Sequence, residues 1–136
     1  MKNPSRNASR WLRQAEFDLE QAQRMLEDAV YSYAAFFAEQ SAQKSLKAFL
    51  LSRGRRRVLT HSVGELAEEA ARSEAAFAGI IEQAKRLDRH YLTSRYPDAL
   101  PEPAIPAEAY GQADADEAVR AARAIFEIAS RAIPNE

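Results

Sequence analysis

One apolar stripe near the start of the chain constrains the fold more than any other feature. Its members recur in alternating steps of four and three positions: Ala8, Leu12, Ala15, Leu19, Ala22, Leu26 and Ala29. This spacing places all seven side chains on one face of an α-helix, which can then pack against a second helix. Small and large side chains alternate along the stripe, and this alternation favours close packing between helices. We therefore predict a long first helix that begins near Ala8.

Two further long helices follow from the same spacing. One is expected from about Tyr31 to Arg53, where Gly54 closes it. The last helix is expected from about Asp114 to Ala132, where Pro134 stops it. Between them lies a third helical region, described next.

The third helical region begins near Thr60, where Ser62 and Glu65 have the spacing of a capping box. It falters near Ser73, which could cap a new segment, and then continues to about Tyr91. No segment alternates at period two, as a half-buried strand would. The sequence thus predicts an all-α, up-and-down bundle of four to five helices without a sheet.

Length and composition predict a single domain over residues 1–136, with a short disordered N-terminus at 1–7 and a proline-rich loop at 96–111. The chain has no cysteine, which excludes disulfides and thiolate metal sites and fits a cytoplasmic location. No apolar run reaches the length of a membrane span, and no signal peptide is expected. The net charge of −1 means that any nucleic-acid contact needs a local basic patch.

Two basic features could provide such a patch. Gln40, Gln43, Lys44 and Lys47 share one narrow polar stripe on the second helix. The stripe is either a solvated face or a site for an anion or a partner, because two neighbouring lysines can bind a phosphate. The other feature is a cluster of four arginines at 53, 55, 56 and 57, which is either an exposed loop at a helix end or a contact to a nucleic-acid backbone.

Residues 87–98 hold the densest run of reactive and charged side chains, and two interpretations of it remain open. In the structural interpretation, Asp88 pairs with Arg89 or Arg95, Tyr91 packs in the core, and Tyr96 anchors the following loop.

In the functional interpretation, arginines of this segment bind a phosphate, a tyrosine stacks on a base, and His90 adds a hydrogen-bond donor. Lysines of the second helix could complete the site. The phosphate-binding candidates are therefore Lys44, Lys47, Asp88, Arg89, Tyr91, Arg95 and Tyr96. With two histidines, no metal-ligand spacing and no glycine-rich phosphate loop, we expect neither a metal site nor a cofactor.

Several segments together resemble one family. They are Trp11 and Ala15 followed by Asp18-Leu19, the run from Ala38 to Ala48, Thr60-His61-Ser62 with Leu66, Leu87 to Tyr91, and Arg95 to Ala99. This series resembles the small stand-alone kind of HEPN domain (higher eukaryotes and prokaryotes nucleotide-binding). The resemblance covers about Ala8 to Ala132. It implies a helical bundle, a homodimer, nucleotide or RNA binding, and a minimal nucleotidyltransferase as partner in a toxin–antitoxin-like pair.

Some members of that family are metal-independent RNases, which carry an arginine, four to six residues and then a histidine on a late helix. Here the order at that place is reversed, because His90 precedes Arg95. The spacing does occur from Arg56 to His61, in the loop before the third helical region. His90, Arg95, Arg56 and His61 are therefore weak catalytic candidates, and the departure from the motif favours a binding module over an enzyme. A pure protein-interaction module is the remaining alternative.

Overall fold

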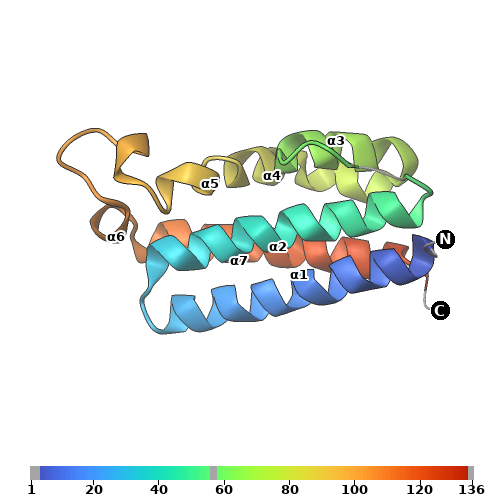
Figure 1. Ribbon diagram of the computed structural model, residues 1–136, viewed down its shortest axis with the longest axis horizontal. Coiled ribbons are helices and arrows are strands. Elements are labelled where there is room, and N and C mark those ends of the chain that lie inside the picture. Colours follow the sequence, from blue (N-terminus) through green and yellow to red (C-terminus); the bar gives the residue numbers. More distant parts are fainter. Residues whose placement is uncertain (1–3, 56–57, 135–136) are drawn as a thin grey trace.

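Three long helices and a row of shorter ones make up the structure (Figure 1). The computed structural model describes residues 4–55 and 58–134. The long helices are α1 (Pro4–Glu27), α2 (Tyr31–Ser52) and α7 (Gln112–Ala132), and they pack side by side. No strand occurs in the described residues, which confirms the predicted all-α fold. Within the same residues, no helix combines the length and apolarity needed to cross a membrane.

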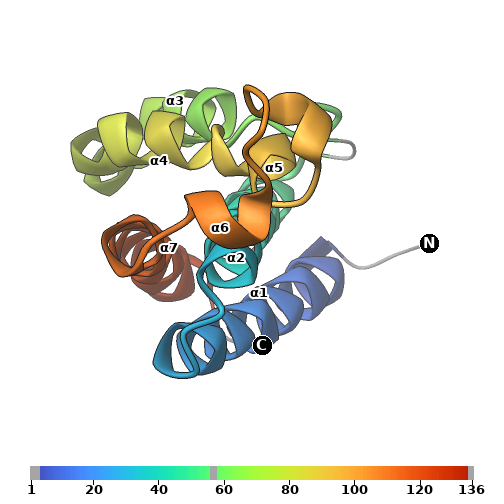
Figure 2. The same cartoon turned by 90° about the vertical axis from the view of Figure 1, so that its left-hand side faces the viewer.

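The described residues between α2 and α7 form six short helices, two of them of the 3-10 type. They are α3 (Val63–Ser73), η1 (Ala75–Ile80), α4 (Ile81–Leu87), α5 (His90–Thr93), η2 (Pro97–Ala99) and α6 (Pro106–Ala109). Viewed end-on, α2 lies in the middle, with α1 on one side and the layer of α3 and α4 on the other (Figure 2). Helices α5 and α6 lie together at one end of the bundle (Figure 1).

Helix α2 takes the central position because one of its faces carries only small side chains. These residues are buried: Ala34, Ala38, Ser41, Ser45 and Ala48. Small side chains let the α1 backbone come close, and the Ser41 hydroxyl donates a hydrogen bond of 2.8 Å to the Ala15 carbonyl of α1. On another side of α2, the Phe49 and Phe77 rings pack with centroids 4.8 Å apart.

The predicted helix ends at Gly54 and Ser62 are confirmed. Gly54 follows α2 with φ +94°, a conformation that glycine adopts without steric cost. Ser62 caps α3 by accepting a hydrogen bond of 3.2 Å from the Glu65 amide. The other half of the box runs through Thr60, whose hydroxyl accepts from the Ser62 amide and donates to the Glu65 carboxylate.

Three predicted helix boundaries need correction. Helix α1 begins at Pro4, so residues 4–7, which we predicted to be disordered, are helical, while residues 1–3 lie outside the described part. Proline suits this start because its missing amide has no partner in the first turn. Ser73 is the last residue of α3 and caps no new segment; its hydroxyl bonds back to the Ala70 carbonyl. Helix α7 begins at Gln112, two residues before the predicted start.

The run from Phe77 to Tyr91, predicted as one helix, is divided into η1, α4 and α5. The interruption at Asp88 and Arg89 turns the Asp88 carboxylate toward the start of α3, as described below. The loop predicted at 96–111 is also partly helical, since η2 and α6 lie within it.

Candidate functional site on the α2 face

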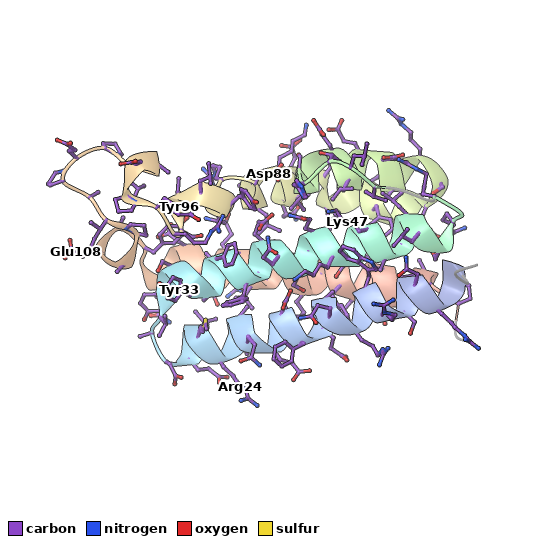
Figure 3. The ribbon with its side chains drawn as sticks, in the orientation of Figure 1. Arg24, Tyr33, Lys47, Asp88, Tyr96 and Glu108 are labelled. Carbon is purple, nitrogen blue, oxygen red and sulfur yellow. The ribbon has the colours of Figure 1, made fainter. Side chains whose placement is uncertain are left out.

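One face of α2 joins the polar stripe of this helix to Arg95 of the segment at residues 87–98. Phe36, Gln40, Gln43 and Lys47 follow steps of four, three and four residues, so they lie along a single line of the helix. Tyr33 and Tyr96 lie at one end of the bundle and Lys47 lies farther along α2 (Figure 3). Gln43 and Lys47 are only 6% and 5% exposed, so the interpretation of this stripe as a solvated face is wrong for these two residues.

Arg95 stands at one end of this line and is surrounded by aromatic rings. Its guanidinium carbon lies 4.3 Å from the Phe36 ring centroid and 4.9 Å from those of Tyr91 and Tyr96. Two of its N–H groups, on Nε and one terminal nitrogen, donate to the Tyr91 carbonyl at 2.9 and 2.6 Å. These contacts fix the plane of the guanidinium, as cation–π stacking and a forked hydrogen bond do together.

Some hydrogen-bond donors of the Arg95 guanidinium are not used by any described residue. Among residues 4–55 and 58–134 it forms no ion pair, and its other terminal nitrogen has no hydrogen-bond acceptor. Arg95 also lines a hollow of about 420 Å³ between the α1–α2 turn and the loop around α6. Other residues lining this hollow include Tyr31, Tyr33, Pro97 and Ile105. An oriented cation at an aromatic hollow is suited to an anionic ligand with a flat apolar part.

The two tyrosines of the predicted segment lie at the surface. Tyr96 is 50% exposed and Tyr91 is 39% exposed. The structural interpretation placed Tyr91 in the core, and this is wrong, because Tyr91 gives one face to Arg95 and another to solvent. Arg89 is exposed as well, and its Nε donates to the Arg86 carbonyl at 3.4 Å.

Asp88 connects α4 to the start of α3. Its carboxylate accepts hydrogen bonds from the Val63 amide at 2.6 Å, the Gly64 amide at 3.1 Å and the Ser62 hydroxyl at 2.8 Å. The first amides of a helix have no partner within the helix, and a carboxylate there also meets the positive end of the helix dipole. The predicted pairing of Asp88 with Arg89 or Arg95 is therefore wrong, and its place in a phosphate site is not supported by these contacts.

At the other end of the line, Lys47 is held in a polar cluster. Its ammonium donates to Gln43 Oε1 at 3.2 Å, lies 3.3 Å from His61 Nδ1, and sits 5.5 Å from the Trp11 ring centroid. His61 Nδ1 also lies 3.2 Å from Gln43 Oε1. Burial lowers the pKa of Lys47, and nearby Lys44 lowers it further, whereas Glu39 opposes the shift.

Lys44 does not share this cluster. Its ammonium forms an ion pair of 2.6 Å with Asp18 of α1, and the Asp18 carboxylate also accepts from the Gln14 amide at 3.1 Å. The structure therefore places Lys44 against α1, so that Lys44 and Lys47 do not converge on the Arg95 end of α2.

Sequence reasoning missed Glu39, the most buried acidic side chain described. Its carboxylate is fully buried and accepts from the Gln40 amide at 2.9 Å and the Gln43 amide at 3.0 Å. Burial raises the pKa of Glu39, and Asp88 adds to this, while the two amides and Arg95 oppose it. A charged residue among the small residues of α2 was the available signal. Phe36 was missed too, although it extends the Gln40–Gln43–Lys47 spacing by one turn.

His90 contacts Tyr110, which lies just before the start of α7. Its Nδ1 lies 2.7 Å from the Tyr110 hydroxyl, which lies 2.7 Å from the Thr93 hydroxyl. Thr93 donates its one proton to the Arg89 carbonyl, so Tyr110 donates to Thr93 and the His90 Nδ1–H donates to Tyr110. Burial lowers the pKa of His90, and Arg89 adds to this. Burial likewise raises the pKa of Tyr110.

The three catalytic candidates within the described residues are not brought together. No described contact joins His90 to Arg95, and His61 contacts Gln43 and Lys47. Arg56 lies outside the described residues. Of the neighbouring arginines, Arg53 pairs with Glu74 at 3.4 Å and Arg55 with Glu69. The described residues contain no cluster of three potential metal ligands.

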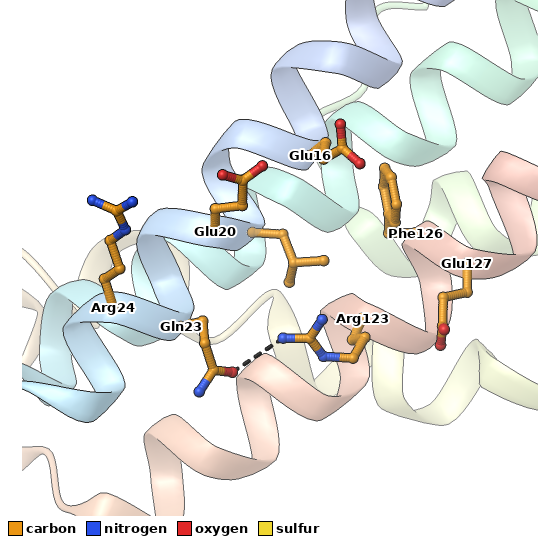
Figure 4. Close-up of a pocket in the computed structure, with 8 residues that line it drawn as sticks. Glu16, Glu20, Gln23, Arg24, Arg123, Phe126 and Glu127 are labelled. Atoms are coloured by element: carbon orange, nitrogen blue, oxygen red, sulfur yellow. Dashed lines mark hydrogen bonds between the residues drawn. The ribbon is translucent and has the colours of Figure 1, made fainter.

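A second hollow of about 430 Å³ lies between α1 and α7 (Figure 4). Its walls carry charges of both signs: Glu16, Glu20, Arg24, Arg123 and Glu127. Arg123 donates to the Gln23 side chain at 3.0 Å across it. Because its charges are mixed, this hollow offers no net attraction to an anion, and the Arg95 end of α2 remains the better candidate site.

Comparison with known proteins gives the family. A family model described as "HEPN domain" matches residues 8–132. The crystal structure of TT1696 from Thermus thermophilus has a TM-score of 0.85 and 34% identity, over 92% of this chain and 97% of that one. The structure of ST0689, described as an archaeal HEPN homologue, has a TM-score of 0.76 and 34% identity, over 98% and 100%. Curated proteins gave no match. The chain therefore belongs to the HEPN family.

Proposed function

We propose that this protein is a binding module for nucleotides or RNA, and that Arg95 is its phosphate anchor. One observation carries the proposal: the Arg95 guanidinium is oriented by three rings and a carbonyl, yet forms no ion pair with a carboxylate among the described residues. Structural arginines usually form ion pairs, whereas an oriented arginine with free donors is suited to a phosphate, whose oxygens match its planar fork.

The surroundings of Arg95 favour a nucleotide over a bare phosphate ion. Exposed aromatic rings lie beside the guanidinium, with Tyr96 in contact with it and Tyr33 at the same hollow. A base can stack on such a ring for about 1–3 kcal/mol, in addition to the energy of phosphate binding. The volume of about 420 Å³ is within the range of small-molecule pockets, about 300–1,000 Å³.

The test is calorimetric titration with ATP, GTP, their monophosphates and a short RNA. The protein should bind at least one of them, and Arg95→Ala should weaken that binding by about tenfold or more, since charge-assisted hydrogen bonds contribute about 1.5–3 kcal/mol. Arg120→Ala is the matched control, because Arg120 is exposed on α7 and, among the described residues, forms an ion pair with Asp116 alone, one turn away. Equal affinity in the Arg95→Ala and control variants would refute the proposal.

A second candidate function is pairing with another protein, which exposed apolar side chains at the same hollow favour. Val30, Tyr33 and Ile105 line it and are 39%, 51% and 39% exposed. The partner proposed from the family is a minimal nucleotidyltransferase, and a second copy of this chain is the other expected partner. Light scattering of the protein alone and with a co-expressed small nucleotidyltransferase distinguishes a homodimer from a complex with the enzyme. If both samples give the mass of a single chain, neither partner is supported.

A further inference from the structure

A separate groove between α1 and α2 carries a concentration of cationic and aromatic side chains. It has a volume of about 590 Å³ and lies on the α1 side of α2, whereas the Arg95 guanidinium stacks near the start of α2 on rings of α2, α5 and the following turn. Its lining comprises Arg10, Trp11, Arg13, Gln14 and Phe17 of α1, with Lys44 of α2.

The charge of this groove is positive. Arg10 and Arg13 form no ion pair within residues 4–55 and 58–134, and both are exposed. The charge of Lys44 is balanced by Asp18, so the two arginines supply the net charge. None of the described lining residues is acidic. The arginines lie one helical turn apart, with β-carbons separated by roughly 5–6 Å, so they can reach successive phosphates of one strand.

The aromatic side chains of the groove are placed for stacking. Phe17 is 55% exposed, so its ring is accessible to a base. Trp11 is partly buried, and the Lys47 ammonium lies over one face of its ring. Alternation of cations with aromatic rings is the pattern of proteins that bind single strands without sequence preference, because every base has a flat face.

We propose that the α1–α2 groove binds a single-stranded polynucleotide. Arg10 and Arg13 contact its phosphates, and Phe17 stacks on one of its bases, with Trp11 forming the wall beside it. An acidic peptide would satisfy the arginines but would gain little from the exposed Phe17 ring. The site is independent of the Arg95 site, since it uses different residues on a different helix pair.

The chain contains one tryptophan, Trp11, which provides a local probe of the groove. Titration with oligo(U) or oligo(dT) of about ten nucleotides should change its fluorescence, and affinity should fall with salt by about 0.7 log units per log unit for each phosphate contacted. In Arg10→Ala/Arg13→Ala, that slope should fall by about 1.4 and affinity should drop at least tenfold. A response to one polymer alone identifies whether the natural ligand is RNA or DNA.

The matched control is Arg24→Ala/Arg120→Ala, which removes the same charge outside the groove. Its affinity and slope should equal those of the unmodified protein, and thermal unfolding should confirm that both double variants are folded. Arg95→Ala should keep the Trp11 response, so failure of the nucleotide site and failure of this groove are distinguishable. The proposal is overturned if neither polymer alters Trp11 fluorescence, if the two double variants behave alike, or if poly-glutamate binds as tightly as the polynucleotides.

Discussion

Asp88 and Arg95 are charged residues seven positions apart in one polar segment, yet the structure uses them in opposite ways. The Asp88 carboxylate binds three donors at the start of α3, so its hydrogen-bonding capacity is directed inward. The Arg95 guanidinium donates two N–H groups to the Tyr91 carbonyl, and its other N–H groups have no acceptor among the described residues. Comparing the partners of each group thus separates a residue that holds the fold from a residue suited to a ligand, although both look equally functional in the sequence.

The largest expected effect comes from removing the Asp88 carboxylate. Asp88→Ala leaves the Val63 and Gly64 amides without their partner, and should lower the free energy of unfolding by about 2–4 kcal/mol. Urea unfolding measures this loss. Asp98→Ala is the control, because Asp98 is an exposed aspartate of the same segment, and a loss of no more than about 0.5 kcal/mol is expected. Equal losses in both variants would mean that Asp88 does not hold α3.

Gly64 tests the same connection from the α3 side. A β-carbon at Gly64 would lie 2.8 Å from Lys85 Cγ and 3.2 Å from the Asp88 carboxylate, so Gly64→Ala should push α4 away from α3 and cost about 1–3 kcal/mol. Gly79→Ala is the control, since a β-carbon there meets no atom within 4 Å. It should be neutral or stabilise by about 0.4–1 kcal/mol, by restricting the unfolded chain. Chemical unfolding of the two variants decides between these results, and similar values would oppose a close α3–α4 contact.

The fold was predictable because helical spacing runs through almost the whole chain. The stripe from Ala8 to Leu26, the small-residue face of α2, and the caps at Gly54 and Ser62 all depend on local spacing, and these predictions were correct. Ala29, the last predicted member of the stripe, lies outside the helix, because α1 ends at Glu27 and Ala29 is an exposed turn residue with φ +63°. The division of the run from Phe77 to Tyr91 was not predicted. It depends on the Asp88 carboxylate reaching amides that lie 24 and 25 residues earlier, a contact that no local pattern reveals.

The candidate site was predictable only as a set of residues. Spacing placed Gln40, Gln43 and Lys47 on one line, but only the folded chain shows that Trp11 and His61 enclose Lys47. Folding also brings Lys44 into an ion pair with Asp18 of α1, which lies 26 residues earlier in the sequence. Which cations pair and which remain available is decided by contacts between helices, and those contacts separate the two interpretations of residues 87–98.

Arg95→Lys tests whether the shape of the guanidinium matters beyond its charge. Lysine keeps the positive charge but loses the planar fork and the broad stacking on Phe36 and Tyr96. We expect nucleotide affinity to fall about tenfold, near 1.4 kcal/mol, while the free energy of unfolding changes by less than about 1 kcal/mol. Parallel calorimetry and urea unfolding give both values. A large loss of stability with unchanged affinity would place Arg95 with Asp88, as a structural residue.

His90 lies between these two residues, and the smallest effect is expected from its protonation. Burial, with Arg89, lowers the pKa of His90 below its ordinary value of 6.5, while Asp114 and Glu117 oppose the shift. Below about pH 6.5 the unfolded chain therefore binds a proton that the folded protein resists, and stability should decline until the pH reaches the lowered pKa. His90→Gln should remove this decline in urea unfolding measured from about pH 7 to about pH 5.

The control for His90 is Tyr110→Phe, which removes only the hydroxyl bonded to the imidazole. This variant should keep most of the decline, because burial is the main cause of the shift. If stability declines equally at low pH in His90→Gln, the decline comes from carboxylates and not from His90. Glu39 cannot be one of them, because its contribution to stability changes with pH in the opposite direction. The pKa of Glu39 is raised, so this residue favours folding at low pH and loses that contribution as the pH rises through the raised pKa.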